Sequence, residues 1–444
     1  MLNTIDWPSA EAEAVRLLQS LLQFDTTNPP GNEAPAAQWL ASVLAQDGIE
    51  SVILESQPTR ANLVARLPGR GEGRPILLLS HLDVVLAEAA RWTHPPFGGD
   101  VADGCIWGRG AIDMKSLTVQ QAMVMLLMKR HGLVPPRDLI LCAVADEEIG
   151  GTWGAKWLVD NHPDLIRSEY AINEGGGYSL SIANQRVYPI EAAQKHGCGL
   201  RLRATGEPGH GSMPHDRNAN LRLARAVSKL TPTATPVHVT PVARAFVEGL
   251  AQRLPRTQAL ALRQLLNPAL NAAVSRLLPD PTVARALNAM LRNTVSPTIL
   301  RGGEKGNVIP GEAYADLDCR LLPGQTCADM VREIQKIVGR GYEFEVLLSG
   351  DAPILPYDTP MYRAIVKTLE RADPGGTVLP YLFPAASDSR FLPKIGVQPY
   401  GFQPMRMPPG LSAVSLAHAH DERIPVEAFT FGLHTLFDLL LNPI

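Results

Sequence analysis

The chain of 444 residues contains 45% hydrophobic and 19% charged residues, which is the composition of a soluble globular protein. Its formal net charge of -3 and its dispersed Lys and Arg residues exclude the concentrated basic surface through which proteins bind nucleic acid or an anionic membrane. A chain of this length exceeds one ordinary hydrophobic core, so we expect two domains.

Two further features of the sequence favour a cytoplasmic protein. The N-terminal residues lack a basic segment followed by an apolar core, and no stretch approaches the roughly 18 consecutive apolar residues of a membrane span. The cysteines are odd in number and lie far apart without a Cys-x-x-Cys pair, which indicates reduced and mostly packed thiols. They are Cys105, Cys142, Cys198, Cys319 and Cys327.

The first part of the chain alternates helical and strand patterns. Apolar residues at helical spacing predict a helix over residues 9–23, with Ser9 as its N-cap. Continuous apolar runs at 76–79 and 139–144 predict strands buried on both faces, and residues 116–131 between them predict a helix. This alternation is typical of an α/β fold. Both strands lead directly into acidic motifs, as expected if the functional site lies at the carboxyl ends of the strands.

The pattern changes near residue 196. Residues 199–204 alternate polar and apolar side chains, as a half-exposed antiparallel strand does. The elements expected after this strand are a helix at about 218–230, strands at 297–301 and 308–321, a helix at 326–338 and a strand at 342–347. The order β-α-β-β-α-β is that of a ferredoxin-like α+β unit.

This unit interrupts the α/β domain. We therefore expect the α/β domain at 1–195 and 353–444, with an inserted domain at 196–352. Within the insertion, residues 232–293 are rich in Ala, Leu and Arg and are broken by prolines, which predicts several short helices. These helices either pack on the inserted domain, or form a substrate lid or a replacement for a subunit contact.

His81 and Asp83 are spaced as a metal ligand and its supporting carboxylate. They lie two residues apart just after a strand, so both side chains can face the same side. His81 can bind a metal through one ring nitrogen while Asp83 accepts a hydrogen bond from the other, which fixes the ring. A structural His–Asp pair is the alternative when the motif is taken alone.

Three more acidic residues follow strands or glycine-rich turns. Asp113 lies in a turn with Gly108 and Gly110 before a helix, where its two oxygens can bridge two cations or cap the helix. Glu147 and Glu148 end an apolar strand, and in extended backbone they point to opposite sides. One of the two can then bind a metal while the other faces substrate; a solvated acidic loop is the alternative.

Together these segments resemble the M20 metallopeptidase and aminoacylase family. The resemblance also covers Glu174 in Asn173–Gly177 and His418 in the segment His418–Arg423, and it runs through nearly the whole chain. It implies a zinc-peptidase-like catalytic domain with an inserted ferredoxin-like lid or dimerisation domain. Glu147 is implied as the general base. By the same resemblance Asp113, Glu148 and His418 hold one metal ion, and His81, Asp113 and Glu174 hold the other, with His420 as an alternative to His418.

The resemblance extends to residues that contact substrate. His210 matches the histidine that stabilises the developing oxyanion, commonly in the partner subunit's site, so a homodimer is expected, although His210 could also act within its own chain. Asn307 and Arg320 match residues that hold a substrate carboxylate, a task that suits the planar donors of Arg. Arg390 in Ser387–Arg390 is a secondary substrate-binding candidate.

The function implied is hydrolysis of an amide bond with two divalent metal ions. His and carboxylate ligands suit zinc, and cobalt or manganese could replace it. The expected substrates are small: N-acyl amino acids rank above dipeptides and carboxypeptidase substrates, with deacetylase, carbamoylase and esterase activities as further alternatives. A non-catalytic binding module on the same fold is disfavoured because Glu147 is present. No nucleic acid or membrane partner is expected.

Overall fold

The computed structural model describes residues 5–278 and 281–444, and the chain divides into two units. The first comprises Met1–Ala192, Pro356–Leu379 and Ser387–Ile444, and the second comprises Ala193–Leu355 and Pro380–Ala386. Residues 193–195, 353–355 and 380–386, which were expected in the α/β domain, thus belong to the second unit. Residues 279–280 of the expected helical insertion lie outside the described residues.

The first unit is built on a mixed sheet with helices. Its strands, of which β9 and β16 continue into the second unit, are β1 (Ser51–Gln57), β2 (Arg60–Leu67), β3 (Ile76–His81), β4 (Val101–Ala102), β5 (Cys105–Trp107), β6 (Leu139–Val144), β7 (Tyr170–Asn173), β8 (Leu180–Ile182), β9 (Gln185–Gln194), β16 (Thr377–Phe383), β17 (Gln398–Gly401) and β18 (Arg423–Pro425). Its α-helices are α1 (Trp7–Leu22), α2 (Ala34–Gln46), α3 (Lys115–Arg130), α4 (Ala155–Asn161), α5 (Pro163–Ile166), α12 (Pro360–Ala372), α13 (Ala413–Leu416) and α14 (Val426–Leu441). Short 3-10 turns are η2 (Ala89–Arg91), η3 (Glu147–Ile149) and η5 (Asp388–Ile395).

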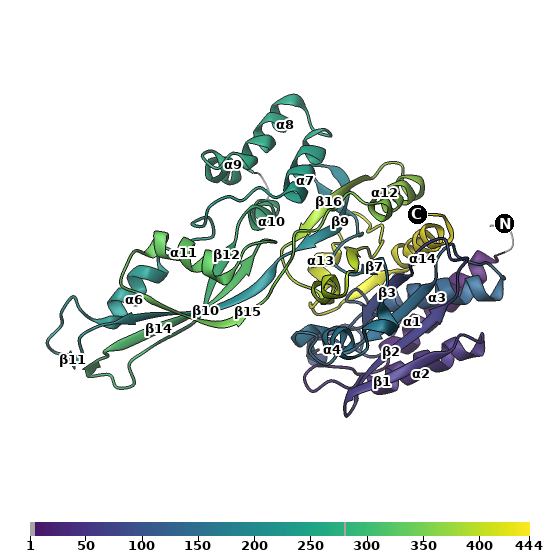
Figure 1. Ribbon diagram of the computed structural model, residues 1–444, viewed down its shortest axis with the longest axis horizontal. Coiled ribbons are helices and arrows are strands. Elements are labelled where there is room, and N and C mark those ends of the chain that lie inside the picture. Colours follow the sequence, from purple (N-terminus) through teal and green to yellow (C-terminus); the bar gives the residue numbers. More distant parts are fainter. Residues whose placement is uncertain (1–4, 279–280) are drawn as a thin grey trace. The chain divides into compact units, whose positions relative to one another are not determined.

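The large sheet has the order β1-β2-β6-β3-β7-β17-β9-β16, with β8 paired to β9. Its centre is parallel, because β3 runs parallel to both β6 and β7, and β7 runs parallel to β17. Every residue of β3 and β6 is buried, which explains why both strands read as continuous apolar runs. On one face, α4 packs in a buried cluster with Leu77, Leu79 and Ile140. Figure 1 shows α2 alongside β1 and β2, which it contacts.

The first helix starts earlier than the sequence pattern indicates. The expected N-cap, Ser9, lies inside α1, and its backbone N–H donates to the side chain of Asp6, which is the actual N-cap. Pro8 in the first turn has no N–H to leave unpaired, so the helix can begin at Trp7. The apolar residues Ala10, Ala14 and Leu18 face the core, as their spacing predicts.

The second unit contains a four-stranded antiparallel sheet and two groups of helices. Its strands are β10 (His196–Thr205), β11 (Gly209–His210), β12 (Thr294–Gly302), β13 (Val308–Ile309), β14 (Glu312–Leu321) and β15 (Glu343–Ser349). Its helices are α6 (Ala219–Val227), α7 (Pro241–Ala251), α8 (Arg256–Arg263), the 3-10 turn η4 (Gln264–Leu266), α9 (Asn271–Leu277), α10 (Pro281–Leu291) and α11 (Cys327–Val338). Helices α7 to α10 lie in the segment 232–293, where short helices are expected.

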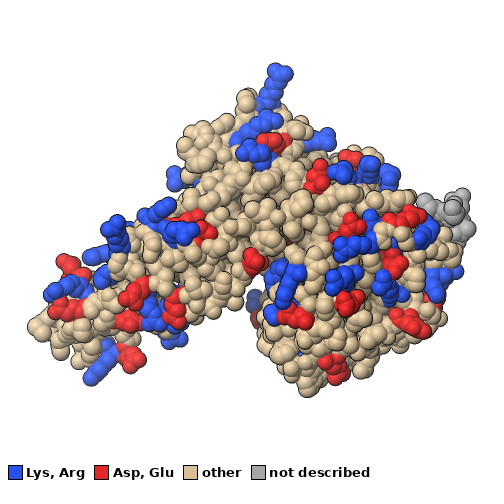
Figure 2. All heavy atoms as spheres, in the orientation of Figure 1, with Lys and Arg blue, Asp and Glu red and all other residues tan. Residues whose placement is uncertain are grey.

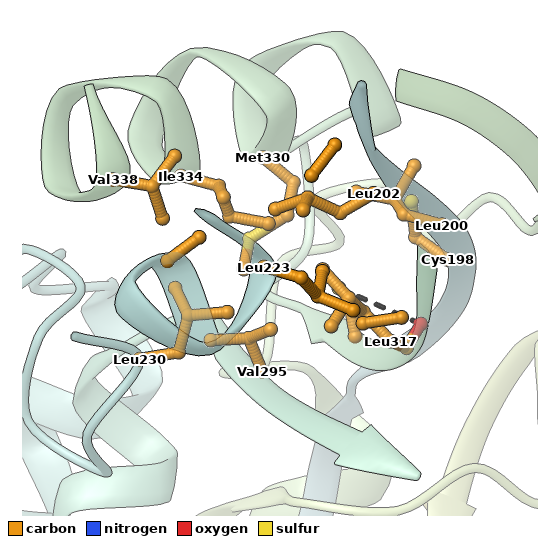
Figure 3. Close-up of a cluster of buried hydrophobic side chains, with 14 of the residues drawn as sticks. Cys198, Leu200, Leu202, Leu223, Leu230, Val295, Leu317, Met330, Ile334 and Val338 are labelled. Carbon is orange, nitrogen blue, oxygen red and sulfur yellow. Dashed lines mark hydrogen bonds between the residues drawn. The ribbon is translucent and has the colours of Figure 1, made fainter. Parts of the chain in front are cut away.

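The sheet order β12-β14-β10-β15 gives this unit the ferredoxin-like β-α-β-β-α-β arrangement. Alternate residues of β10 and β14 point into a core that α6 and α11 cover, as the labelled Leu200, Leu317 and Met330 show in Figure 3. The segment expected as one strand at 308–321 is two strands, β13 and β14, because Pro310 and Gly311 separate them.

Two of the cysteines form a disulfide, contrary to the expectation of reduced thiols throughout. Cys198 on β10 and Cys327 at the start of α11 are bonded, although 129 positions separate them in sequence. The spacing rules could not find this pair because the fold, and not the sequence, brings β10 and α11 together. Cys105, Cys142 and Cys319 are free and buried.

No helix in the described part of the chain is long and apolar enough to cross a lipid bilayer. On the face of the protein drawn in Figure 2, basic and acidic side chains of the described residues are interspersed. This distribution agrees with the small net charge of -3.

Candidate metal centre

Four residues of the candidate site lie at the ends of three neighbouring parallel strands of the first unit. His81 is the last residue of β3, Glu147 and Glu148 lie in η3 just after β6, and Glu174 directly follows β7. Strands β6, β3 and β7 are adjacent and parallel, so their carboxyl ends meet at one edge of the sheet. The structure therefore gathers these side chains at the edge where α/β sheets place their sites.

The ring of His81 is fixed by the residue two positions further on. Its Nδ1 lies 2.9 Å from the backbone carbonyl oxygen of Asp83 and 3.4 Å from the Asp83 carboxylate. The nearer partner is thus the carbonyl and not the expected carboxylate. Both residues are buried, with exposed fractions of 2% and 0%. A hydrogen bond at Nδ1 directs Nε2 toward the acidic cluster, as a metal-binding imidazole requires.

The carboxylate of Asp83 holds the turn that carries the two consecutive glutamates. It accepts hydrogen bonds from the backbone N–H groups of Glu147 at 3.1 Å and of Glu148 at 3.2 Å. Glu147 and Glu148 lie in a 3-10 turn preceded by Asp146 in the left-handed conformation, with φ 74. The expected extended backbone is therefore wrong, and the turn, rather than strand alternation, separates the two side chains.

Asp113 lies between two groups of side chains. Its Oδ1 is 3.1 Å from Nε2 of His81, and its Oδ2 is 3.0 Å from Nε2 of His418. Glu174 completes the first group, 3.9 Å from the same His81 nitrogen, and Glu148 completes the second, 3.1 Å from the His418 nitrogen. Each oxygen of Asp113 thus faces one imidazole and one further carboxylate, which is the arrangement of a bridging ligand.

The spacing of these atoms fits two cations. In each group the ligand atoms lie within 4.8 Å of one another. Atoms bound to zinc at about 2.1 Å in a tetrahedron lie about 3.4 Å apart, close to the separations observed. In the second group Oε1 of Glu148 is buried and has no hydrogen-bond partner, so it is free to bind a cation. Glu174 takes its place in the first group from a glycine-rich turn.

The two histidines near the C-terminus are distinguished by position. His418 reaches Asp113 and Glu148, whereas His420 belongs to neither group of potential ligands among the described residues. His418 has a positive φ of 62, so the backbone here is not the extended strand in which residues two apart face the same side. The geometry therefore favours His418 as the ligand.

The electrostatics of the cluster reflect its concentration of carboxylates. Burial raises the pKa of Glu174 well above its ordinary value, and the charge of Asp113 raises it further. Hydrogen bonds with Asp113 and Glu148 raise the pKa of His418 to about 10. Burial lowers the pKa of His81, but hydrogen bonds and charge from its carboxylate neighbours outweigh burial and bring it well above the ordinary value.

Glu147 stays outside both groups. Its carboxylate lies 3.9 Å from the guanidinium of Arg390, which η5 contributes to the same unit. Burial raises the pKa of Glu147 well above its ordinary value, and the carboxyl groups of Asp388 and Glu148 add to the effect. Arg390, expected only as a secondary substrate residue, thus lies beside the candidate base.

Sequence reasoning missed a buried glutamate that positions Asp113. Glu422 is fully buried, and its Oε1 accepts hydrogen bonds from the backbone N–H groups of Ile112 at 2.7 Å and Asp113 at 3.0 Å. Its other oxygen accepts a bond from Arg109 at 2.6 Å. The segment His418–Arg423 therefore supplies both a candidate ligand and a support for the bridging aspartate. The ion pair of Arg109 with Glu422 could not be predicted from the sequence, because 313 positions separate the two residues.

A second missed group supports Asp83 from behind. Asn28 donates from Nδ2 to Asp83 at 2.8 Å and to Asp146 at 3.2 Å. Arg60 pairs with Asp146 at 2.9 Å and with Glu33 at 2.8 Å. All five residues are buried. The Asn-Pro-Pro-Gly run in the segment Thr26–Glu33 indicates a turn. The sequence does not indicate that Asn28 of this turn contacts Asp83 and Asp146.

A comparison with protein-family models matches residues 77–442 to peptidase family M20/M25/M40. The chain belongs to this family. The match spans all the candidate ligands and most of both units. The resemblance read from the sequence motifs is confirmed, and the M20 chain is a hydrolase of amide bonds.

Relatives of this M20 chain include enzymes named for N-acyl amino acids. It is 28% identical over 444 residues to aminoacylase-1 of Mus musculus, covering 98% of this chain and 96% of the relative. It is 29% identical over 389 residues to the N-fatty-acyl-amino acid synthase/hydrolase PM20D1 of Homo sapiens, covering 83% and 74%. The M20 metallo-carboxypeptidase Sso-CP2 of Sulfolobus solfataricus has a similar fold, with a TM-score of 0.70, 17% identity and coverage of 97% and 98%.

Three of the expected site residues of the M20 chain lie in its second unit. His210 is exposed on β11, where its Nδ1 is 2.7 Å from the hydroxyl of Ser212. Asn307 lies next to it, because its carbonyl accepts a hydrogen bond from Gly211 and β11 pairs with β13. Arg320 lies on β14 and forms an ion pair with Asp318 at 2.9 Å.

Within one chain, Asn307 and Arg320 lie toward opposite ends of the sheet of the second unit. Asn307 lies at the end of the sheet where Glu312 begins β14, and Arg320 lies near the opposite end. At about 3.3 Å per residue, the strand from Glu312 to Arg320 spans about 26 Å. Figure 1 shows β11 beyond the corresponding end of β10 and β14. One carboxylate cannot contact both side chains within a single chain.

Binding of a divalent cation at pH 7 is expected to release protons. His418, whose pKa is about 10 without a cation, is protonated at that pH and must lose its proton before Nε2 can act as a ligand. Metal affinity should therefore rise with pH and fall as the medium becomes more acidic. Calorimetric titration of metal-free enzyme with zinc chloride, in buffers of different ionisation enthalpy, measures the released protons. Replacement of the exposed His131 by Asn serves as control, and an enthalpy independent of the buffer would contradict the expectation.

Proposed function

We propose that the protein hydrolyses the amide bond of N-acyl amino acids with two divalent metal ions. His81, Asp113 and Glu174 would hold one ion, and Asp113, Glu148 and His418 the other. The observation that carries this proposal is the position of Asp113, whose two oxygens face two separate groups at 3.1 and 3.0 Å. Further support comes from the M20 fold neighbour of Bacillus subtilis that is described as a dinuclear metal binding peptidase.

Zinc is the proposed metal because imidazole and carboxylate ligands at these spacings suit it, with cobalt or manganese as substitutes. When bound, the two ions would polarise the scissile carbonyl and acidify the attacking water. Three of the five ligand residues are carboxylates, so the ligands contribute at most three negative charges, which the ions would neutralise. Glu422 and Asp83, through their backbone hydrogen bonds, hold the ligand loops in place without binding the ions.

Glu147 is the proposed general base. It is nearly buried and belongs to neither ligand group, and its raised pKa makes it a stronger proton acceptor than an exposed glutamate. It would take a proton from the attacking water and give it to the leaving amine. Arg390, 3.9 Å away, would keep the carboxylate oriented during this transfer.

The substrate carboxylate is assigned to Arg320, whose planar guanidinium can donate two parallel hydrogen bonds. This assignment favours substrates with a free carboxylate. N-acyl amino acids rank first because aminoacylase-1 and the PM20D1 enzymes are relatives over 83% or more of this chain. Dipeptidase and carboxypeptidase activities are the second candidate, favoured by the folds of Sso-CP2 and of human carnosine dipeptidase 1.

A homodimer is proposed in which His210 and Asn307 act in the site of the second copy. The separation of about 26 Å along β14 supports this arrangement, because it keeps the pair away from Arg320 of the same chain. His210 would then stabilise the oxyanion that develops on the substrate. The cytoplasm is retained as the proposed location on the strength of three buried free thiols, although the Cys198–Cys327 disulfide argues for an oxidising compartment.

The proposed function is tested by comparing substrate classes on one preparation. Metal-free enzyme, the same enzyme reloaded with zinc, and untreated enzyme would be assayed on N-acyl amino acids, dipeptides and the matching N-acyl amino esters. Hydrolysis of N-acyl amino acids that is lost on metal removal and restored by zinc is the expected result. Faster cleavage of dipeptides would favour the second candidate. Activity on esters alone, or activity untouched by metal removal, would contradict the proposal.

A further inference from the structure

A lysine of the second unit is buried without a counter-ion. Lys195 joins β9 to β10, and 0% of its surface is exposed. Its ammonium donates a hydrogen bond to the hydroxyl of Thr294 at 3.3 Å, and no carboxylate of the described residues lies within ion-pair distance. A charged group taken out of water and left without a partner of opposite charge is strongly disfavoured. An anion bound beside this ammonium would supply the opposite charge that the described residues do not provide.

A second buried lysine, Lys115, differs from Lys195 in the charges of its neighbours. Lys115 of the first unit is also fully buried, but four carboxylate groups, beginning with Asp25, act on it and its ammonium donates to the carbonyl of Phe24 at 2.8 Å. The charged group that acts on Lys195 is another cation, Arg320. Burial, and then the charge of Arg320, lower the pKa of Lys195 to about 7. Lys195 and Arg320 therefore create a concentration of positive charge.

The strand register brings this charge to one face of the sheet. Arg320 on β14 pairs with Thr294 on β12 and with Gly197 on β10. Directly paired residues of antiparallel strands point to the same face. The adjacent residues Val295, which is labelled in Figure 3, and Cys319 belong to the buried core, so Thr294 and Arg320 point to the opposite face. Lys195 reaches the same hydroxyl of Thr294 from the start of β10.

Arg320 can exchange its present partner. Its ion pair with Asp318 joins two side chains of the same strand that are 42% and 45% exposed, and such exposed pairs contribute little stability. An incoming carboxylate could therefore replace Asp318 at the guanidinium. Lys195, in contrast, has no carboxylate partner among the described residues, so a bound carboxylate would place the first opposite charge beside its ammonium.

We propose that Lys195, Thr294 and Arg320 form one carboxylate-binding site, with Lys195 as the residue that selects for a negatively charged end of the substrate. The inference rests on the proposed function, in which that carboxylate belongs to an N-acyl amino acid. Two cations and one hydroxyl match the two oxygens of a carboxylate. A neutral carboxamide would leave the ammonium unpaired, and the site would reject it.

The site should respond to pH in a defined direction. Lys195 is charged below its pKa of about 7 and neutral above it, so the affinity for a carboxylate should fall as pH rises through this value. The other charged groups beside Lys195 are Arg320 and its ion-pair partner Asp318 on the same strand. His196, the neighbour in sequence, directs its Nε2 to the backbone carbonyl of Gln325 at 3.0 Å.

The test compares Lys195→Met and Lys195→Arg with Lys336→Met, a matched control on the exposed surface of α11. Each variant would be assayed on the best N-acyl amino acid and on its C-terminal carboxamide. Lys195→Met should raise KM for the carboxylate substrate at least about tenfold, which corresponds to about 1.4 kcal/mol, with kcat little changed. The carboxamide should show no such change, and Lys195→Arg should restore most of the affinity. Equal losses on both substrates, with Lys195→Arg as poor as Lys195→Met, would assign Lys195 a structural role and overturn the proposal.

Two further measurements separate this proposal from the proposed function. KM of the wild type for the carboxylate substrate should rise between pH 6 and pH 8.5, and the same profile should be flat in Lys195→Arg. Calorimetric binding of N-acetylmethionine to Glu147→Gln, with and without Lys195→Met, does not depend on turnover. Failure of the wild type to hydrolyse any N-acyl amino acid overturns the proposed function. If N-acetylmethionine binds equally well to Glu147→Gln with and without Lys195→Met, or binds to neither protein, the proposed role of Lys195 is overturned.

Discussion

Replacing Glu147 by glutamine is expected to lower kcat by about two to four orders of magnitude while both metal ions stay bound. Glu147 belongs to neither group of potential ligands, and its carboxylate faces Arg390 at 3.9 Å. Glutamine preserves the size of the side chain and the backbone hydrogen bond to Asp83, but it cannot accept a proton. The variant should therefore bind substrate and lose turnover. Steady-state kinetics together with the metal content of the purified protein measure both parts of this prediction.

A matched variant separates this effect from a general change of charge. Glu88→Gln removes a carboxylate that is exposed on the same unit and pairs only loosely with Arg91, at 3.6 Å. It should retain the kcat and the metal content of the wild type. Turnover of Glu147→Gln at the level of this control would remove Glu147 from the reaction. Loss of one metal ion from Glu147→Gln would instead make it a ligand.

The parts of the fold that depend on local pattern could be predicted from the sequence. The apolar runs at 76–79 and 139–144 correspond to β3 and β6, because strands buried on both faces need apolar side chains at every position. No local pattern in the sequence predicts which strands lie beside β3 and β6 in the sheet. That β7 lies next to β3 and carries Glu174 to the same edge is a property of the topology.

The candidate ligands could be named from the sequence because the His and carboxylate residues lie in motifs that resemble those of the M20 family. The residues that hold these ligands in place could not be predicted. Glu422 lies 310 positions from Ile112, whose backbone N–H it binds, and nothing local in either segment indicates this contact. The separation of Asn307 from Arg320 has the same origin, since residues that serve one substrate in a family need not be close within one chain.

The backbone conformation of η3 could not be predicted from the sequence either. Strand alternation is a reasonable expectation for two glutamates that follow β6, yet the chain leaves the strand at Asp146, where φ is 74. The carboxylate of Asp83 stabilises this turn by accepting both following N–H groups. The same residue binds His81 through its carbonyl oxygen. Asp83 thus couples the position of one candidate ligand to that of the candidate base, which is a tertiary effect.

Replacing Asp113 by alanine is expected to remove both metal ions, whereas replacing Glu148 or Glu174 by glutamine should remove only one. Asp113 is the one residue common to both groups of potential ligands among the described residues. Without it, each group keeps one imidazole and one carboxylate, which is too few to hold an ion tightly. Loss of several kcal/mol of charge stabilisation corresponds to a fall in kcat/KM of at least about three orders of magnitude.

Metal content per chain after dialysis measures the stoichiometry of each variant, and melting temperature establishes that the chain is folded. Asp113→Asn adds a sharper comparison, because it keeps the shape of the side chain and the backbone N–H bond to Glu422 while it loses the charge and one oxygen. It should bind at most one ion. If Asp113→Ala retained two ions per folded chain, the two groups would be independent sites, and a shared centre acting on one amide bond would have no structural basis.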